Sequence, residues 1–163
     1  MDASNCGVLA FVYEHFKSAP QLKRDSLGCT SRSFLGFPTS EEFVRRAEES
    51  LAIMLPTAIR ARLLQENGGE IEADGDVWEL FPVEDSTDRK RISRTANHIV
   101  RETEEARQWP EFPATAVAIA TNGTGDYLIL QPARQASGQL LDEVFLWNHE
   151  TGGVTPVDVT WSV

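Results

Sequence analysis

The 163-residue sequence has few basic residues for its number of acidic ones, and this shortage limits the partners that it can bind. It contains 15 lysine and arginine residues against 25 aspartate and glutamate residues, so its formal net charge is −10 at pH 7. Nucleic acids and anionic membranes are bound mainly through lysine and arginine, so we expect neither as a partner. Such a charge attracts cationic proteins, although an acidic surface also serves solubility alone.

Cysteines and long apolar segments are also scarce. The only cysteines are Cys6 and Cys29, and two isolated cysteines are typical of free thiols in a reducing compartment. No apolar run approaches the length of a membrane span. The apolar run at residues 8–13 is short and no basic residue precedes it, which argues against a secretory signal peptide. These features predict a cytoplasmic protein.

The sequence lacks the motifs that carry catalysis. It has no Gly-x-Ser-x-Gly nucleophile elbow and no Gly-Lys-Ser/Thr phosphate loop. Its three histidines, His15, His98 and His149, lie in unrelated contexts. Cys6, His15 and Cys29 offer soft metal ligands, but their spacing matches no zinc pattern. We therefore predict a protein without catalytic residues, cofactor or metal.

Hydrophobic periodicity predicts helices in the first part of the chain. One amphipathic helix is expected after Ser40, because apolar residues recur every three or four positions as far as Met54. Pro56 ends this helix and opens a second, which two glycines end. A third helix is predicted over residues 89–108 and a short one over residues 6–16.

Runs of β-favouring residues between turn residues predict strands in the rest of the chain. These runs cover residues 77–81, 116–120, 127–130, 144–147 and 154–161. Helical patterns followed by strand patterns indicate an α+β domain. Residues 1–36 are expected to form an N-terminal helix and an extended connection.

The most unusual stretch runs from Glu66 to Asp88, where nine residues are acidic and none is basic. The candidate partner-binding residues in it are Asp74, Asp76, Glu84 and Asp85. The alternative is a solvated loop that is neutralised by the basic start of the next helix, at Arg89, Lys90, Arg91 and Arg94. Alternating carboxylates from Glu70 to Asp76 would also suit a hard cation if they lay on a strand, but they lack the order of a calcium loop, so we expect a solvated loop there.

Several short motifs occur in an order that suggests a family. They are Glu48 and Leu51, Leu55-Pro56, Leu63, Asn67-Gly68-Gly69, then Trp78, Leu80 and Pro82, and finally Gly125-Asp126. In this order and spacing they resemble the SUKH superfamily of Smi/Knr-type domains. Its best-known members are bacterial immunity proteins of toxin systems and a fungal regulator of cell-wall synthesis.

The resemblance implies a non-catalytic α+β domain over residues 37–163, with helices packed against a central, mostly antiparallel sheet. Bacterial members of the family bind and neutralise toxin domains, many of them nucleases. The resemblance also implies that the partner is another protein, and a basic toxin domain suits the charge of −10. Two alternatives stay open: a regulatory or small-molecule-responsive domain, and a metal-dependent enzyme that uses the Glu70–Asp76 carboxylates. We expect the motif residues to maintain the fold, with Pro56 and Gly68 setting backbone angles, Trp78 burying area and Asp126 bonding the backbone of its turn.

Overall fold

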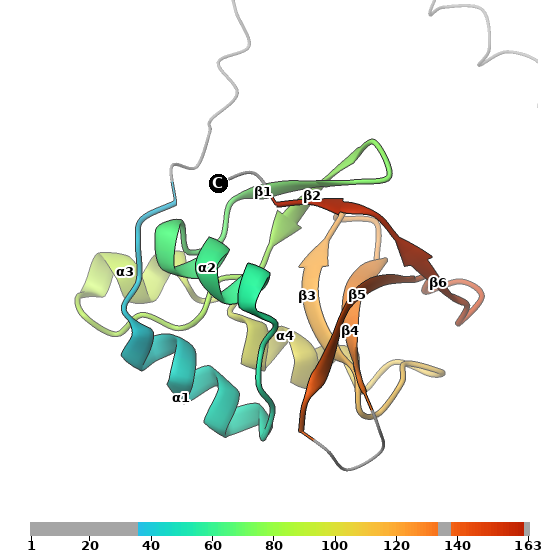
Figure 1. The fold of residues 1–163 in the computed structure, drawn as a ribbon, viewed down its shortest axis with the longest axis horizontal. Helices are drawn as coiled ribbons and strands as arrows, with labels where there is room; N and C mark the ends of the chain where they lie inside the picture. Colours follow the sequence, from blue (N-terminus) through green and yellow to red (C-terminus); the bar gives the residue numbers. More distant parts are fainter. Residues whose placement is uncertain (1–35, 134–137, 162–163) are drawn as a thin grey trace, which may run out of the picture. The chain divides into compact units, whose positions relative to one another are not determined.

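The computed structural model describes residues 36–133 and 138–161. Within these ranges the chain forms four helices and one seven-stranded sheet, which confirms the predicted α+β class. The helices are α1 (Glu41–Leu51), α2 (Thr57–Gln65), α3 (Arg89–Arg94) and α4 (Ile99–Ala106), and they lie to one side of the strands in Figure 1. The helix predicted over residues 6–16 lies outside the described residues.

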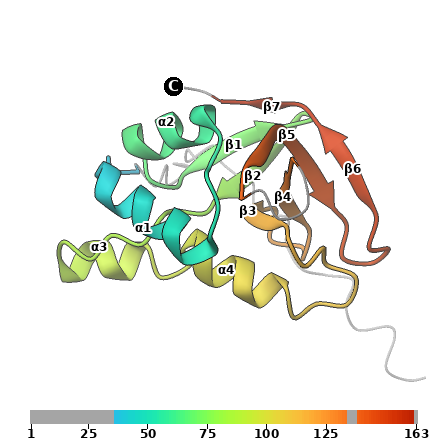
Figure 2. The ribbon, with the colours of Figure 1, turned by 60° about the horizontal axis from the view of Figure 1, so that its bottom comes forward.

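The sheet is antiparallel between all neighbouring strands, in the order β6-β5-β4-β3-β2-β1-β7. Its strands are β1 (Glu70–Ala73), β2 (Asp76–Leu80), β3 (Val117–Thr121), β4 (Tyr127–Pro132), β5 (Leu140–Trp147), β6 (Val154–Val157) and β7 (Val159–Thr160). The edge strands β6 and β7 are separated in the chain by Asp158 alone. The ends of these strands are therefore about 7 Å apart. The two edges meet at this point, so the sheet is strongly curled, which can be followed in Figure 2.

The five predicted strand runs are confirmed, with two changes. The run at residues 144–147 is the end of the longer strand β5, and the run at 154–161 is divided at Asp158 into β6 and β7. The expectation of a solvated loop at residues 70–76 is wrong. Residues 70–73 and 76–80 form an antiparallel hairpin, because the sequence Asp74-Gly75 makes a two-residue turn in which both φ angles are positive.

Helix α1 ends earlier than its apolar pattern predicts. Its last residue is Leu51, and Ala52 caps it in the left-handed conformation, with φ 54°. Met54 is consequently outside the helix and 69% exposed, and its amide donates to the Gly138 carbonyl over 2.7 Å. The predicted joint at Leu55-Pro56 is present: the amide of buried Leu55 donates to the Glu48 side chain over 2.9 Å.

The single long helix predicted over residues 89–108 is wrong, because the chain turns at residues 95–98 and forms α3 and α4 instead. The Thr95 hydroxyl donates to the Arg91 carbonyl at the end of α3 and accepts the amide of Asp85. His98 caps the start of α4, where its Nδ1 accepts the Arg101 amide over 3.3 Å. The break leaves Ile92, which was expected on an apolar face, 46% exposed.

The hydrophobic core lies between the sheet and the helices. The largest fully buried side chains are those of Val44, Ile59, Leu63, Leu80, Phe81, Val83, Ile99, Ile119, Leu128, Ile129, Leu130 and Trp147. Helix α4 is fixed on β3 by Thr103, whose buried hydroxyl accepts the Ala118 amide over 3.1 Å. This packing holds the sheet and its hairpin in place, so the surfaces described below stand on a rigid scaffold.

Candidate protein-interaction surface

The β1–β2 hairpin presents a row of carboxylates to solvent. Alternation along the strands buries Ile71, Ala73, Trp78 and Leu80 and exposes Glu70, Glu72, Val77 and Glu79. The register places Glu70 opposite Glu79, and Glu72 opposite Val77, which is 64% exposed. Like charges directly opposite each other destabilise a strand pair. We call the residues Glu70, Glu72, Val77 and Glu79 the acidic hairpin face; Asp76 lies beside it at the start of β2.

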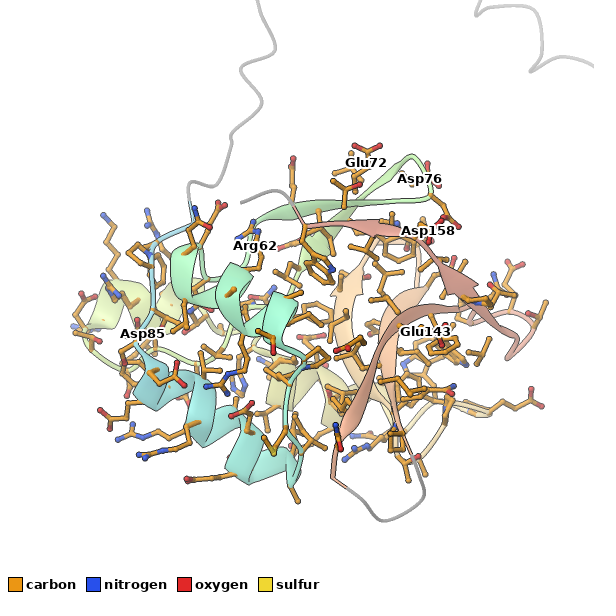
Figure 3. All side chains as sticks on the ribbon, viewed as in Figure 1. Arg62, Glu72, Asp76, Asp85, Glu143 and Asp158 are labelled. Carbon is orange, nitrogen blue, oxygen red and sulfur yellow. The ribbon has the colours of Figure 1, made fainter. Side chains whose placement is uncertain are left out.

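No residue of the acidic hairpin face forms an ion pair with a basic residue in the part of the chain that the structure describes. Other acidic residues do, as Glu42 with Arg46 and Glu105 with Arg101 illustrate. Figure 3 labels Glu72 and Asp76 along one edge of the molecule, together with Asp158. The negative charge at this edge is therefore uncompensated, and an apolar side chain lies within it.

Asp74 lies at the tip of this hairpin and has a structural contact. Its Oδ1 accepts the Asp158 amide over 3.1 Å, and its own amide donates to the Asp158 carbonyl over 3.1 Å. The two bonds join the β1–β2 turn to the link between the edge strands β6 and β7. Asp74 adopts φ 50°, a conformation that aspartate tolerates better than most residues. Asp74 is thus exposed and also holds the curled sheet together.

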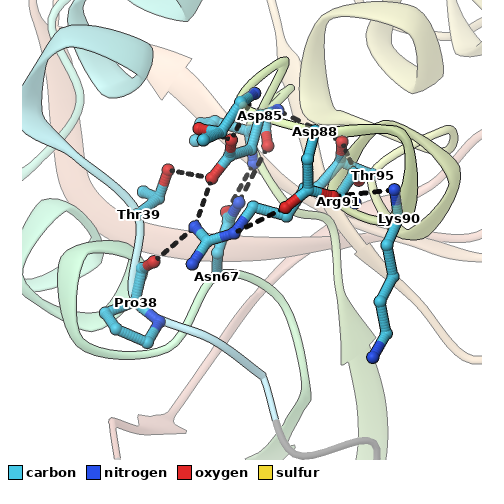
Figure 4. Close-up of polar contacts among 10 residues, drawn as sticks. Pro38, Thr39, Asn67, Asp85, Asp88, Lys90, Arg91 and Thr95 are labelled. Atoms are coloured by element: carbon cyan, nitrogen blue, oxygen red, sulfur yellow. Dashed lines mark hydrogen bonds and ion pairs between the residues drawn. The ribbon is translucent and has the colours of Figure 1, made fainter.

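The prediction that Asp85 binds a partner is wrong, because its side chain is fully buried. It accepts from the amide and hydroxyl of Thr87 over 3.0 and 2.5 Å, and from Arg91 over 2.8 Å. The Thr39 hydroxyl also donates to it, over 3.4 Å. Burial acts to raise the pKa of Asp85, but the bonds from Thr87 and Arg91 outweigh it and hold the pKa below its ordinary value. Figure 4 shows this network, which ties three segments of the chain together.

The acidic stretch thus divides into two parts that the fold separates. Asp76 and Asp85 lie on opposite sides of the molecule in Figure 3. Asp85 and Asp88 serve the basic start of α3: Arg91 pairs with both, and Asp88 caps the helix by accepting the amides of Lys90 and Arg91. Glu84 is exposed next to Asp85 and forms no ion pair within the described residues. Of the four candidate residues, only Asp74 and Asp76 lie together.

The Asn67-Gly68-Gly69 motif connects α2 to the sheet. The Asn67 side chain donates to the Val83 carbonyl over 2.9 Å and accepts the Val83 amide over 2.8 Å. Gly68 and Gly69 adopt φ 90° and 87°, and a Cβ on Gly69 would lie 2.9 Å from a carboxylate oxygen of Glu66. The positive φ angles favour glycine, so the motif sets the path of the chain from α2 into the hairpin.

The Gly125-Asp126 motif lies against the turn that follows β5. Asp126 Oδ1 accepts the His149 amide over 3.0 Å and contacts His149 Nδ1 at 2.8 Å. Burial acts to raise the pKa of Asp126, but the bonds with His149 outweigh it and lower the pKa. The His149 ring lies where a Cβ on Gly125 would meet it at 3.1 Å. Asp126 therefore bonds the backbone of a second turn, which the sequence did not indicate.

A metal site and a pocket are the remaining candidates in the described residues. No three histidine, cysteine, aspartate or glutamate side chains are arranged to hold a metal ion within residues 36–133 and 138–161. Cys6, His15 and Cys29 lie outside these residues. An open pocket of about 370 Å³ lies at the end of α1 and includes Met54 and Ile53. No helix in this part of the chain has the length and apolar character needed to cross a membrane.

Comparison with known proteins gives one family. The model of the SMI1 / KNR4 family (SUKH-1) matches residues 38–162, a range that contains every helix and strand described above. No curated protein and no solved structure matches the chain. The match covers most of the chain and includes the Leu55-Pro56, Asn67-Gly68-Gly69 and Gly125-Asp126 motifs.

Proposed function

The chain belongs to the SMI1 / KNR4 family (SUKH-1), and on that premise we propose that it is a non-catalytic, cytoplasmic protein-binding module of the immunity type. Its partner in this proposal is a basic toxin domain, for example a nuclease, which it binds and neutralises. The observation that carries the proposal is the acidic hairpin face, where carboxylates without basic partners surround exposed Val77. The family supports a binding or regulatory role, and the hairpin supplies a surface for it.

Charge and shape both support this surface as a contact for a cationic protein. Uncompensated carboxylates on a rigid sheet attract a basic partner and accelerate its encounter. An exposed valine among them offers apolar area that becomes buried on contact. The carboxylates of Glu70 and Glu79 lie opposite each other and repel each other in the free protein. A lysine or arginine of the partner, placed between them, would relieve this repulsion. We place Asp74 and Asp76 at the rim of the contact, and Glu84 and Asp85 outside it, on the far side of the molecule (Figure 3).

The first test is capture of the partner from native lysate by the tagged full chain, followed by identification and expression of the captured protein. We expect a basic protein whose expression arrests growth and whose effect is relieved when this chain is expressed with it. Capture of acidic proteins only, or of a protein whose activity is unaffected by this chain, would contradict the proposal.

A pair of charge-matched variants tests the surface. The hairpin variant carries Glu72→Gln, Asp76→Asn and Glu79→Gln, and the control carries Glu104→Gln, Asp142→Asn and Glu143→Gln, all at exposed positions. Both variants lose the same charge, so any difference between them reports position. We expect the hairpin variant to associate with the partner about threefold to tenfold more slowly at low salt, with a smaller change in dissociation. Equal association rates for the two variants would place the contact elsewhere.

A further inference from the structure

A second exposed feature lies away from the hairpin, where Trp109 is 45% exposed in the segment that joins α4 to β3. Its ring is supported from behind, because it packs edge-on against Trp147 at 6.4 Å and against His149 at 6.2 Å between ring centroids. Trp147 is fully buried and contacts Phe112 at 5.1 Å. Trp109 is thus a rigid exposed aromatic group, the residue type that most often anchors protein contacts.

The turn beside Trp109 is also rigid. Asp126 bonds both the amide and the ring of His149, as described above, and leaves the opposite ring nitrogen of His149 outside this contact. The Asn148 side chain accepts the amides of Glu150 and Thr151 over 3.2 and 3.0 Å. This turn therefore has its present shape without any ligand, and binding to it would require little ordering.

Glu111 completes the arrangement and lies in a turn that fixes its position. It is a non-glycine residue with φ 64°, and its side chain lies against Gly152, where a Cβ would collide with the Glu111 carboxylate. Nevertheless, the Glu111 carboxylate forms no hydrogen bond or ion pair within the described residues. The Phe112 amide donates to the Trp109 carbonyl over 3.3 Å and closes a turn around Pro110 and Glu111, which accounts for the positive φ. This turn holds the exposed Glu111 carboxylate beside Gly152, where it is available to a cation.

The charges around the aromatic cluster are negative. Glu111 and Glu150 are exposed carboxylates, and Arg107, the basic residue nearest to Trp109 in the sequence, donates to the Ala116 carbonyl over 3.2 Å. Burial raises the pKa of Tyr127 in this cluster, and Glu102 and Glu105 raise it further. A tryptophan face beside free carboxylates favours a cation, because the ring and the carboxylates attract it together.

We propose that Trp109, Glu111 and the turn at residues 148–153 form a second contact site, which takes an arginine or lysine side chain of a protein partner. The cation lies against the exposed Trp109 ring, and Glu111 and Glu150 supply the opposite charge. The inference rests on the proposed function in one respect, that the ligand belongs to a protein. It differs in location, because no residue of the acidic hairpin face takes part.

The test uses a defined probe in place of the unknown partner. A capped Gly-Arg-Gly peptide is titrated into the ¹⁵N-labelled full chain, and the indole signals of the four tryptophans are followed by NMR. We expect the Trp109 indole to shift and the buried tryptophans to stay unchanged. The same peptide with citrulline in place of arginine, which has nearly the same shape without charge, is expected to give no shift. An equal shift with citrulline would overturn the proposal.

Two variants of Glu111 separate binding from folding. We expect Glu111→Gln to weaken the arginine peptide about threefold to tenfold. Glu111→Gly relieves the positive φ, so we expect an unchanged or higher melting temperature together with the same loss of affinity. Unchanged affinity in both variants would refute the site, and a lower melting temperature in Glu111→Gly would show a structural role instead.

The hairpin variant distinguishes this proposal from the proposed function. If the Trp109 site is separate, the hairpin variant binds the arginine peptide as wild type does, even though it associates slowly with the partner. Failure to capture a toxin would leave the peptide titration unaffected. Loss of the Trp109 shift in the hairpin variant would show that general acidity, and not this site, attracts the peptide.

Discussion

At the scale of single residues, Asp76 and Asp85 show how the same side chain takes opposite roles. Asp76 is exposed and unpaired within the described residues, whereas Asp85 is buried and accepts four hydrogen bonds. Composition indicates only that both belong to an acidic stretch. Burial depends on the path of the chain after β2, which carries Asp85 beneath Thr39 and Arg91. That long-range contact has no local signal in the sequence.

We predict that Asp85→Asn destabilises the protein by about 2–4 kcal/mol, because it removes the charge that Arg91 and the Thr87 donors share in a buried site. Asp76→Asn is the matched control and should change the free energy of unfolding by about 0.5 kcal/mol or less. Urea denaturation of both variants at pH 7 measures the difference. Equal stabilities would mean that Asp85 is solvated in solution.

The stability difference between wild type and Asp85→Asn is expected to depend on pH. The pKa of Asp85 is lowered in the folded protein, so its contribution to stability is present above the unfolded pKa, about 3.9, and is lost as pH falls through the folded pKa. The difference in stability between wild type and Asp85→Asn should therefore be constant from pH 7 to about pH 5 and shrink below pH 4. A difference that stays constant to pH 2 would contradict the lowered pKa.

At the scale of elements, the joint between α1 and α2 and most strands followed from local patterns, because Pro56 and the β-favouring runs act over a few residues. Strand β1 was not predicted, although Asp74-Gly75 is a strong hairpin signal. The density of charge around this turn favours a loop, whereas the alternation of buried Ile71 and Ala73 with exposed acidic residues is that of a strand. The break between α3 and α4 was missed because Thr95 is held by Asp85, a partner ten residues away that helical periodicity does not include.

The hairpin turn gives a prediction that involves the backbone alone. Gly75 has φ 85° and a Cβ on it would meet nothing within 4 Å, so Gly75→Ala creates no collision. We expect a loss of about 1–2 kcal/mol from the left-handed conformation of alanine. Gly75→Asn is the control and should lose less, because asparagine tolerates this conformation better. Thermal or urea unfolding provides the measurement, and identical stability of all three proteins would show that the turn has another conformation.

At the scale of the whole molecule, the fold class, the family and the acidic stretch followed from the sequence, but the second contact site at Trp109 did not. Motifs such as Asn67-Gly68-Gly69 and Gly125-Asp126 are short because each fixes backbone geometry at one place. The second contact site, in contrast, combines distant segments: Trp109 and His149 belong to different turns, and they meet only because β3, β4 and β5 lie side by side. Periodicity does not predict such a meeting.

The curled sheet itself depends on a contact that joins distant parts of the chain. Asp74, at the tip of the β1–β2 hairpin, bonds Asp158, the residue that connects the two edge strands. Strand β7 has only two residues and pairs with β1 at two positions, so it has little other support. The side chain of Asp74 therefore stabilises the place where the edges of the sheet meet.

We predict that Asp74→Ala costs about 1–2 kcal/mol, because alanine lacks the acceptor for the Asp158 amide and disfavours φ 50°. Asp74→Asn keeps a side-chain acceptor and tolerates this backbone, so its stability should stay close to that of wild type. Hydrogen exchange locates the effect: the Asp158 amide and β7 should exchange faster in Asp74→Ala alone. If both variants exchange alike and faster than wild type, the negative charge of Asp74, and not its geometry, holds the edges together. If neither differs from wild type, β7 is held by its pairing with β1. Because Asp74→Asn removes the charge and keeps the geometry, it is also the variant in which the effect of Asp74 on association with the partner is measured without disturbing the sheet.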